Sequence, residues 1–130
     1  MLSKFLLPET VTRQNGTGPV LELDRVGGEK LLLTLGITRI IEQESLDVEV
    51  WGSGDKFNWG DKPLVRFPQK FYCGTYSMPL DLAKRPDVKY LRIAFKLNRW
   101  GRADASPLFG FYVYAQEASQ AATAFRAAVA

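Results

Sequence analysis

Six carboxylates lie between residues 42 and 61, and these side chains could carry out acid–base chemistry. They are Glu42, Glu44, Asp47, Glu49, Asp55 and Asp61. A glycoside hydrolase needs two such groups, one as an acid and one as a base or nucleophile. Asp47 and Glu49 alternate with valines, which is typical of the solvent side of a strand, whereas Asp55 and Asp61 lie in turn-forming sequence. We therefore expect solvated or turn-capping carboxylates here and not a catalytic pair.

The chain has no histidine and a single cysteine. The absence of histidine excludes Ser-His-Asp triads, Cys-His dyads and His-ligated metals. One cysteine, Cys73, excludes an intrachain disulfide and a Cys-rich zinc site, and its apolar surroundings predict a buried thiol. Gly52 and Gly54 do not precede a helix, so they do not form a phosphate-binding loop. We predict a protein that is not an enzyme and uses no metal or cofactor.

Aromatic side chains and two arginines are better candidates for a binding surface. The set is Trp51, Phe57, Trp59, Arg99, Trp100 and Arg102. Sugar rings stack on such aromatics while polar groups fix their orientation. Alternatively, Trp59 and Trp100 close the ends of the fold. The loop with the two arginines could form a surface cation–π pair, or contact nucleic acid by stacking and phosphate contacts.

The first half of this set depends on one predicted strand and the turn after it. Residues 46–51 (LDVEVW) alternate between apolar and polar side chains, the period of a half-buried strand. Residues 52–58 (GSGDKFN) have turn chemistry. Trp59 closes this turn and could fold back over it. The remaining chain predicts further strands that pack around this one.

Other short apolar segments are separated by Gly- and Pro-rich turns, which predicts an antiparallel β-sandwich. The predicted strands cover residues 20–24, 30–41, 64–67, 71–82, 88–97 and 108–115. Residues 30–41 are the most apolar and predict a central strand covered on both faces, with Gly36 as a bulge or kink. Pro79 indicates an edge strand or a bend over residues 71–82.

The two ends of the chain differ from the middle. We predict an N-terminal arm over residues 1–18, a β-sandwich domain over 19–115, and an Ala-rich C-terminal helix or tail over 116–130. The apolar residues of the last segment recur at helical spacing. This segment packs on its own sandwich, engages another subunit or is a disordered tail.

Composition limits the choice of partners. A chain of 130 residues with 46% hydrophobic residues fits one domain with a real core. Its net charge of +3 comes without a dense Lys/Arg run, so we do not expect nucleic acid as a partner. There is neither an apolar run long enough to span a membrane nor a signal-peptide pattern, and we expect an intracellular protein.

Two short motifs resemble those of the discoidin-like, or galactose-binding-like, β-sandwich. Residues 50–59 (VWGSGDKFNW) are similar to its S-x-D-G-x-x-W turn, and residues 89–93 (KYLRI) to its R-Y-[IL]-R-[ILV] strand. The resemblance covers roughly residues 30–97. It departs at Asp55-Lys56, where the family has Asp-Gly, and in lacking the paired cysteines of secreted members. The resemblance implies a jelly-roll sandwich and a binding role, but no ligand residue carries over.

These observations favour a structural or assembly protein that acts through self-association or contacts with another protein. Its arms would reach into neighbouring subunits of a homo-oligomer. The alternative is a module of the galactose-binding-like type that binds carbohydrate or another small ligand.

Overall fold

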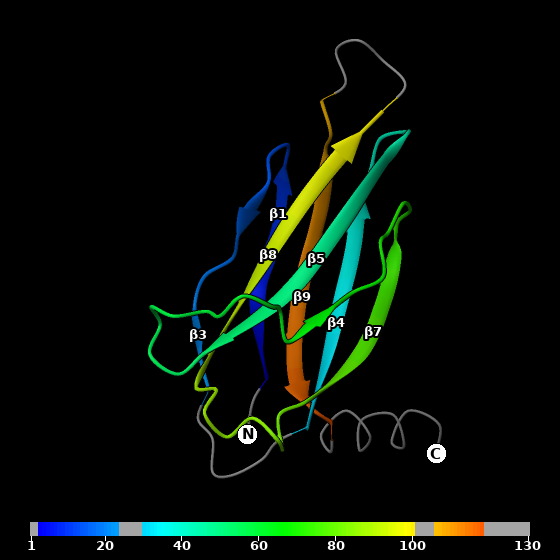
Figure 1. The fold of residues 1–130 in the computed structure, drawn as a ribbon. Coiled ribbons are helices and arrows are strands. Elements are labelled where there is room, and N and C mark those ends of the chain that lie inside the picture. The colour runs from blue at the N-terminus through cyan, green and yellow to red at the C-terminus, as the bar shows by residue number, and fades with distance from the viewer. Residues whose placement is uncertain (1–2, 24–29, 101–105, 119–130) are drawn as a thin grey trace, which may run out of the picture.

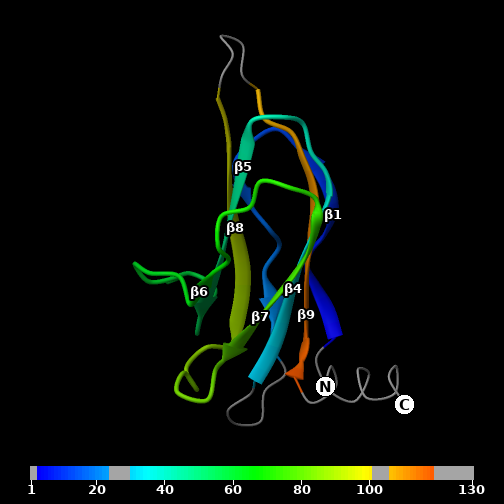
Figure 2. The ribbon, with the colours of Figure 1, turned by 90° about the vertical axis from the view of Figure 1, so that its right-hand side faces the viewer.

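Two antiparallel sheets form the fold in the computed structural model, which describes residues 3–23, 30–100 and 106–118. Four strands form the β4 sheet, in the order β1 (Ser3–Thr12), β9 (Phe109–Glu117), β4 (Lys30–Arg39) and β7 (Gly74–Asp81). The β5 sheet has the order β2 (Gly16–Thr17), β8 (Tyr90–Arg99), β5 (Glu44–Ser53) and β6 (Val65–Arg66), and β3 (Leu21–Glu22) also pairs with β8. The two sheets lie face to face (Figures 1 and 2). The predicted β-sandwich is confirmed.

Alternation along the strands builds the core. Leu31, Leu33 and Leu35 of β4 are fully buried, and the intervening Leu32 and Thr34 are half-buried on the outer face. The two sheets meet through aromatic contacts such as that of Phe95 in β8 with Phe111 in β9, whose ring centroids are 5.2 Å apart. Fully burying one such side chain stabilises the fold by about 1.5–3 kcal/mol.

Two predictions about strand position are confirmed. Residues 88–97 form most of β8, with Leu91 and Ile93 fully buried. Strand β7, which contains Pro79, lies at the edge of the β4 sheet. An edge tolerates proline because the missing N–H has no partner strand on that side.

Residues 3–12 are part of the sandwich and not of the separate N-terminal arm predicted for residues 1–18. They form β1, which pairs with β9, and they place Leu6 and Leu7 in the core. The pairing with β9 and the burial of Leu6 and Leu7 stabilise this segment as a strand, although the sequence after it is rich in turn-forming residues. At the other end, Gln116 and Glu117 continue β9 instead of starting a helix. The rest of the predicted helix, residues 119–130, lies outside the described residues.

Three local predictions need correction. Gly36 pairs in register with Thr75 and Tyr112 and forms no bulge. A Cβ atom there would lie 2.1 Å from the Tyr112 ring, so glycine makes room for that ring. Strand β4 is central, but it is fully covered on its core face only. Cys73 is exposed, because it precedes β7 in a connecting segment where strand alternation does not apply.

No helix within the described residues is long and apolar enough to cross a membrane.

Candidate functional site

The five predicted binding residues that the structure describes do not form one site. In the β5–β8 pair, Ser53 lies opposite Tyr90 and Glu44 lies opposite Arg99, so the turn after Ser53 and the loop after Arg99 are at opposite ends. Ten-residue strands separate these ends by about 30 Å. Arg102 lies outside the described residues. The described candidate residues therefore belong to two separate surfaces.

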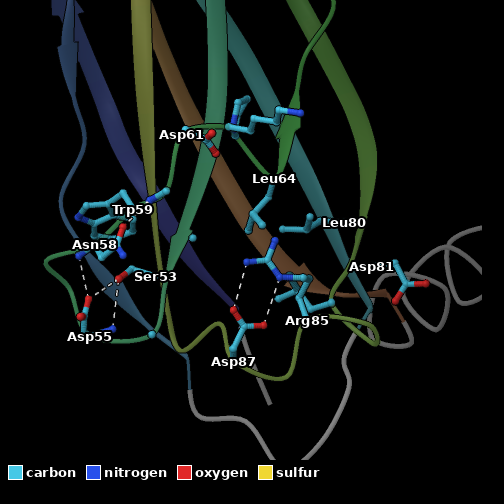
Figure 3. A pocket seen from close by; sticks show the side chains of 16 residues that line it. Ser53, Asp55, Asn58, Trp59, Asp61, Leu64, Leu80, Asp81, Arg85 and Asp87 are labelled. Atoms are coloured by element: carbon cyan, nitrogen blue, oxygen red, sulfur yellow. Dashed lines mark hydrogen bonds and ion pairs between the residues drawn. The ribbon is translucent and has the colours of Figure 1, made fainter.

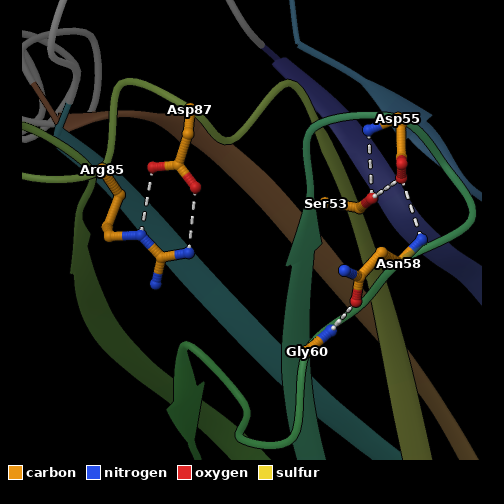
Figure 4. Close-up of polar contacts among 6 residues, drawn as sticks. All are labelled: Ser53, Asp55, Asn58, Gly60, Arg85 and Asp87. Carbon is orange, nitrogen blue, oxygen red and sulfur yellow. Dashed lines mark hydrogen bonds and ion pairs between the residues drawn. The ribbon is translucent and has the colours of Figure 1, made fainter.

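Hydrogen bonds fix the turn after β5 (Figure 4). The buried Ser53 hydroxyl donates to Asp55 Oδ1 at 3.0 Å and accepts the N–H groups of Asp55 and Lys56. Asp55 Oδ1 also accepts the N–H groups of Asn58 at 2.8 Å and Phe57 at 2.9 Å. These two backbone bonds, followed by the Ser53 hydroxyl, lower the pKa of Asp55. The expected turn-capping role of Asp55 is confirmed.

Lys56 and Trp59 complete this turn. Lys56 has φ of 72°, a left-handed conformation that favours glycine, and the resembled motif has glycine at this position. Trp59 Nε1 donates to the Lys56 carbonyl oxygen at 3.0 Å, so the indole folds back over the turn as predicted. The Arg92 guanidinium lies 4.4 Å from the Trp59 ring centroid. Trp59 thus packs on the outer side of β8 and does not close the end of the sandwich.

The other two aromatics of this half differ in environment. Trp51 lies opposite Arg92 and is half-buried, and its Nε1 is buried without a hydrogen-bond partner among the described atoms. Phe57 at the tip of the turn is 88% exposed.

A hollow of about 620 Å³ lies between this turn and the loop after β7 (Figure 3). Trp59, Asp61 and Lys62 line it from one side. From the other side, Arg85 donates two hydrogen bonds to the Asp87 carboxylate, at 3.1 and 3.2 Å. An aromatic ring beside polar groups of both signs suits a polar ligand that has hydroxyl groups.

An exposed aromatic cluster forms at the opposite end of the molecule, and we call it the aromatic end cluster. It comprises Phe71, Tyr72 and Trp100, which are 41%, 72% and 45% exposed. The Phe71 ring meets Trp100 edge-on at 6.2 Å and lies 6.4 Å from Tyr72. Since nearly half of Trp100 is exposed, it does not close the sandwich. The three rings are instead exposed at this end of the molecule.

Arg99 positions this end of the molecule. Its guanidinium donates to the carbonyl oxygens of Glu42 and Ser106, at 3.2 and 3.3 Å. The backbone N–H of Trp100 donates to the Gln43 carbonyl oxygen at 3.0 Å. Arg99 is thus a side chain that ties two loops together.

Sequence reasoning missed the role of Glu44. This side chain is 2% exposed, and its two carboxylate oxygens accept the N–H groups of Ile41 at 2.9 Å and Leu108 at 2.8 Å. It therefore joins the start of β5 to the segment that leads into β9. Extending the inward positions Leu46, Val48 and Val50 back by two residues would have placed Glu44 inside.

Carboxylates on the outer face of the β5 sheet are held by their neighbours. Glu49 forms an ion pair with Arg66, and Asp47 accepts a hydrogen bond from Gln69 at 3.2 Å. Lys96 lies directly opposite Asp47. Both carboxylates lie on the outer side of β5, as predicted. Within the described residues, no three Cys, Asp or Glu side chains are grouped so that they could hold a metal ion.

Comparisons with known proteins give a fold and no family. No family model matches the sequence, and no curated protein matches it. A chain from the structure of infectious bursal disease virus Gx strain is similar in fold, with a TM-score of 0.56 and 6% sequence identity. The match covers 88% of this chain but 31% of that one, so this chain spans about a third of the viral chain's length. The likeness supports the all-β antiparallel fold, while the finer resemblance to discoidin-like sandwiches stays a prediction.

Proposed function

We propose that this chain is a non-enzymatic structural protein that works through self-association or contacts with other proteins. The observation that carries the proposal is that exposed aromatic side chains gather into clusters. Phe71, Tyr72 and Trp100 form the aromatic end cluster, and the exposed Phe5 contacts the half-buried Tyr112 and Tyr114 on the outer face of the β4 sheet. Contiguous apolar patches on a small domain mark interaction sites more often than scattered exposed residues do.

The sheet edges favour association through faces and ends. Strand β7 contains Pro79, and β1 contains Pro8 and two register shifts. On the β5 sheet, the outermost strands β2, β3 and β6 have two residues each. Prolines, irregular pairing and short edge strands all oppose the addition of a strand from another molecule. Copies would therefore meet through side chains and not by extending a sheet.

The similar fold in the structure of infectious bursal disease virus Gx strain is compatible with this role, since a sandwich of this kind occurs there within a larger chain. The likeness concerns the fold, and the proposal rests on the surface of this chain.

Sedimentation velocity on the full-length chain, over a wide concentration range and at low and high salt, tests the proposal. We expect particles well above the 14.6 kDa monomer that persist at high salt, because apolar contacts are not screened. A monomer at every concentration, with no partner bound, would argue against it.

The hollow beside Trp59 favours a second candidate, a module that binds carbohydrate or another small polar ligand. Trp59 would stack on a sugar ring, and Asp61, Lys62 and Arg85 would bind its hydroxyl groups. A glycan screen monitored by tryptophan fluorescence tests this candidate. Binding should be lost in Trp59→Ala and retained in Trp100→Ala, whose side chain lies at the other end. Equal responses of the two variants would exclude the hollow as the site.

A further inference from the structure

The outer face of the β4 sheet has an uncharged centre. Directly paired residues lie on the same face of an antiparallel sheet. One row across all four strands consists of Phe5, Tyr114, Thr34 and Ser77. The two neighbouring rows contain Gln116, Leu32, Pro79, Tyr112, Gly36 and Thr75. None of these ten residues is charged.

The aromatic rings of this centre are held in place before any partner arrives. Tyr112 occupies the space that a side chain at Gly36 would fill. The Phe5 ring meets the Tyr112 and Tyr114 rings edge-on, with centroids 5.9 and 4.9 Å apart. The three rings line a groove of about 620 Å³, where Glu9 is the one charged residue among the described lining residues. Ordered tyrosines lose little conformational entropy on binding.

Charged residues lie around this centre. Lys30, at one end of β4, lies opposite Asp81 of β7, and Arg39, at the other end of β4, lies opposite Gly110 of β9. A polar rim around an apolar centre is the usual anatomy of a protein interface. Apart from Glu9 in the groove, this centre lets the surface face an identical surface without bringing like charges together.

The size of the face fits such a contact. Four strands about 4.8 Å apart, with nine residues rising about 3.4 Å each, give a projected area of about 600 Å². A standard interface buries about 800 Å² of accessible surface per partner, and accessible surface exceeds projected area.

We propose that the outer face of the β4 sheet is a homotypic interface, in which a second copy of this chain packs its own β4 sheet against the Phe5, Tyr112 and Tyr114 rings. The inference rests on the proposed function and deepens it by naming the surface and the partner. The outer face of the β5 sheet stays exposed in this arrangement.

Sedimentation equilibrium on two full-length variants tests the inference. Thr34→Arg places a charge at the centre of the interface and should raise the dissociation constant at least about tenfold. Ala94→Arg is the matched control, because Ala94 is half-buried on the outer side of the central strand β8, and it should leave the dissociation constant within about twofold. Circular dichroism and thermal unfolding check that both variants fold. If Thr34→Arg does not fold, Ser77→Arg on the exposed edge strand gives the same test.

The outcomes separate the interface from the function. An assembly that Thr34→Arg leaves intact and Trp100→Arg disrupts would overturn the homotypic face, assign contact to the aromatic end cluster, and leave the proposed function standing. A wild-type chain that is monomeric at every concentration would overturn the homotypic face and remove self-association from the function. If Thr34→Arg loses association while Ala94→Arg and Trp100→Arg keep it, the result supports both the homotypic face and the proposed function.

Discussion

The outer faces of the two sheets differ in the kind of contacts that their side chains form. On the β5 sheet, Glu49 binds Arg66, and Arg92 lies over the Trp59 ring. On the β4 sheet, the Phe5 ring contacts the Tyr112 and Tyr114 rings, and Glu9 is the one charged residue among the described residues that line the groove there. An ion pair and a cation–π contact mark the first face, whereas contacts between aromatic rings mark the second.

Both faces come from the same alternating pattern, so the inner side of each strand says little about function. Val48 in β5 and Leu33 in β4 are both buried in the core between the sheets. The difference lies at the intervening positions, where β5 has Asp47 and Glu49 and β4 has Thr34 and Gly36. For this fold, the outward residues carry the information about partners.

The largest expected effect concerns two carboxylates of β5, one between the sheets and one on the outer face. Glu44→Ala leaves the N–H groups of Ile41 and Leu108 without their acceptor and should lower the free energy of unfolding by about 3 kcal/mol. Glu49→Ala breaks a surface ion pair and should cost under about 1 kcal/mol. Chemical denaturation of both variants measures the difference, and equal losses would contradict the structural role of Glu44.

A smaller effect separates the two outer faces directly. Gly36→Val drives a side chain into the space of the Tyr112 ring and should lower the free energy of unfolding by about 2 kcal/mol. Ala94→Val on the β5 sheet should change it by less than about 0.5 kcal/mol. Thermal and denaturant unfolding provide the test. A Gly36→Val protein as stable as wild type would mean that Tyr112 does not need this space.

The smallest effect concerns the turn after β5 and depends on pH. The folded-state pKa of Asp55 is lowered by hydrogen bonds from Asn58, Phe57 and Ser53, so it lies below the unfolded value of about 3.9. The stability that Asp55 contributes is complete above that value and is lost as the pH falls through the folded-state pKa. Below about pH 4, the unfolding temperature of wild type should therefore fall more steeply than that of Asp55→Asn.

The matched control for this titration is Asp61→Asn. Asp61 lines the same hollow, but its carboxylate caps no turn among the described hydrogen bonds. Its pH profile should follow wild type. Identical slopes for wild type and Asp55→Asn would remove Asp55 from the acid response.

Most of the sandwich could be predicted from the sequence, because strand alternation is a local property. The inward side of β8 and the edge position of β7 follow from Leu91, Ile93 and Pro79. The pairing of β1 with β9 could not be predicted, because partners about 100 residues apart leave no local pattern in the sequence. The same limit explains the missed contact between Glu44 and Leu108.

The candidate site was only partly predictable. The Ser53–Asp55–Trp59 turn could be predicted from residue types, since each of these side chains forms hydrogen bonds with residues only two or three positions away in the sequence. Trp59 and Trp100 lie at opposite ends of the molecule because of the register of β5 against β8. A sequence alone does not give this register. The aromatic face also depends on register, because Phe5 meets Tyr112 and Tyr114 only when β1 pairs with β9.

The most direct test of the account is hydroxyl-radical footprinting of the wild-type, full-length chain at increasing concentration, with oxidation at each residue measured by mass spectrometry. Oxidation of Phe5, Tyr112 and Tyr114 should fall as the protein associates, while oxidation of Trp59, which packs against Arg92 on the outer side of β8, should stay constant. If the three β4-sheet aromatics stay equally reactive while the assembly forms, or if Trp59 is protected in their place, the β4 face is not where the copies meet.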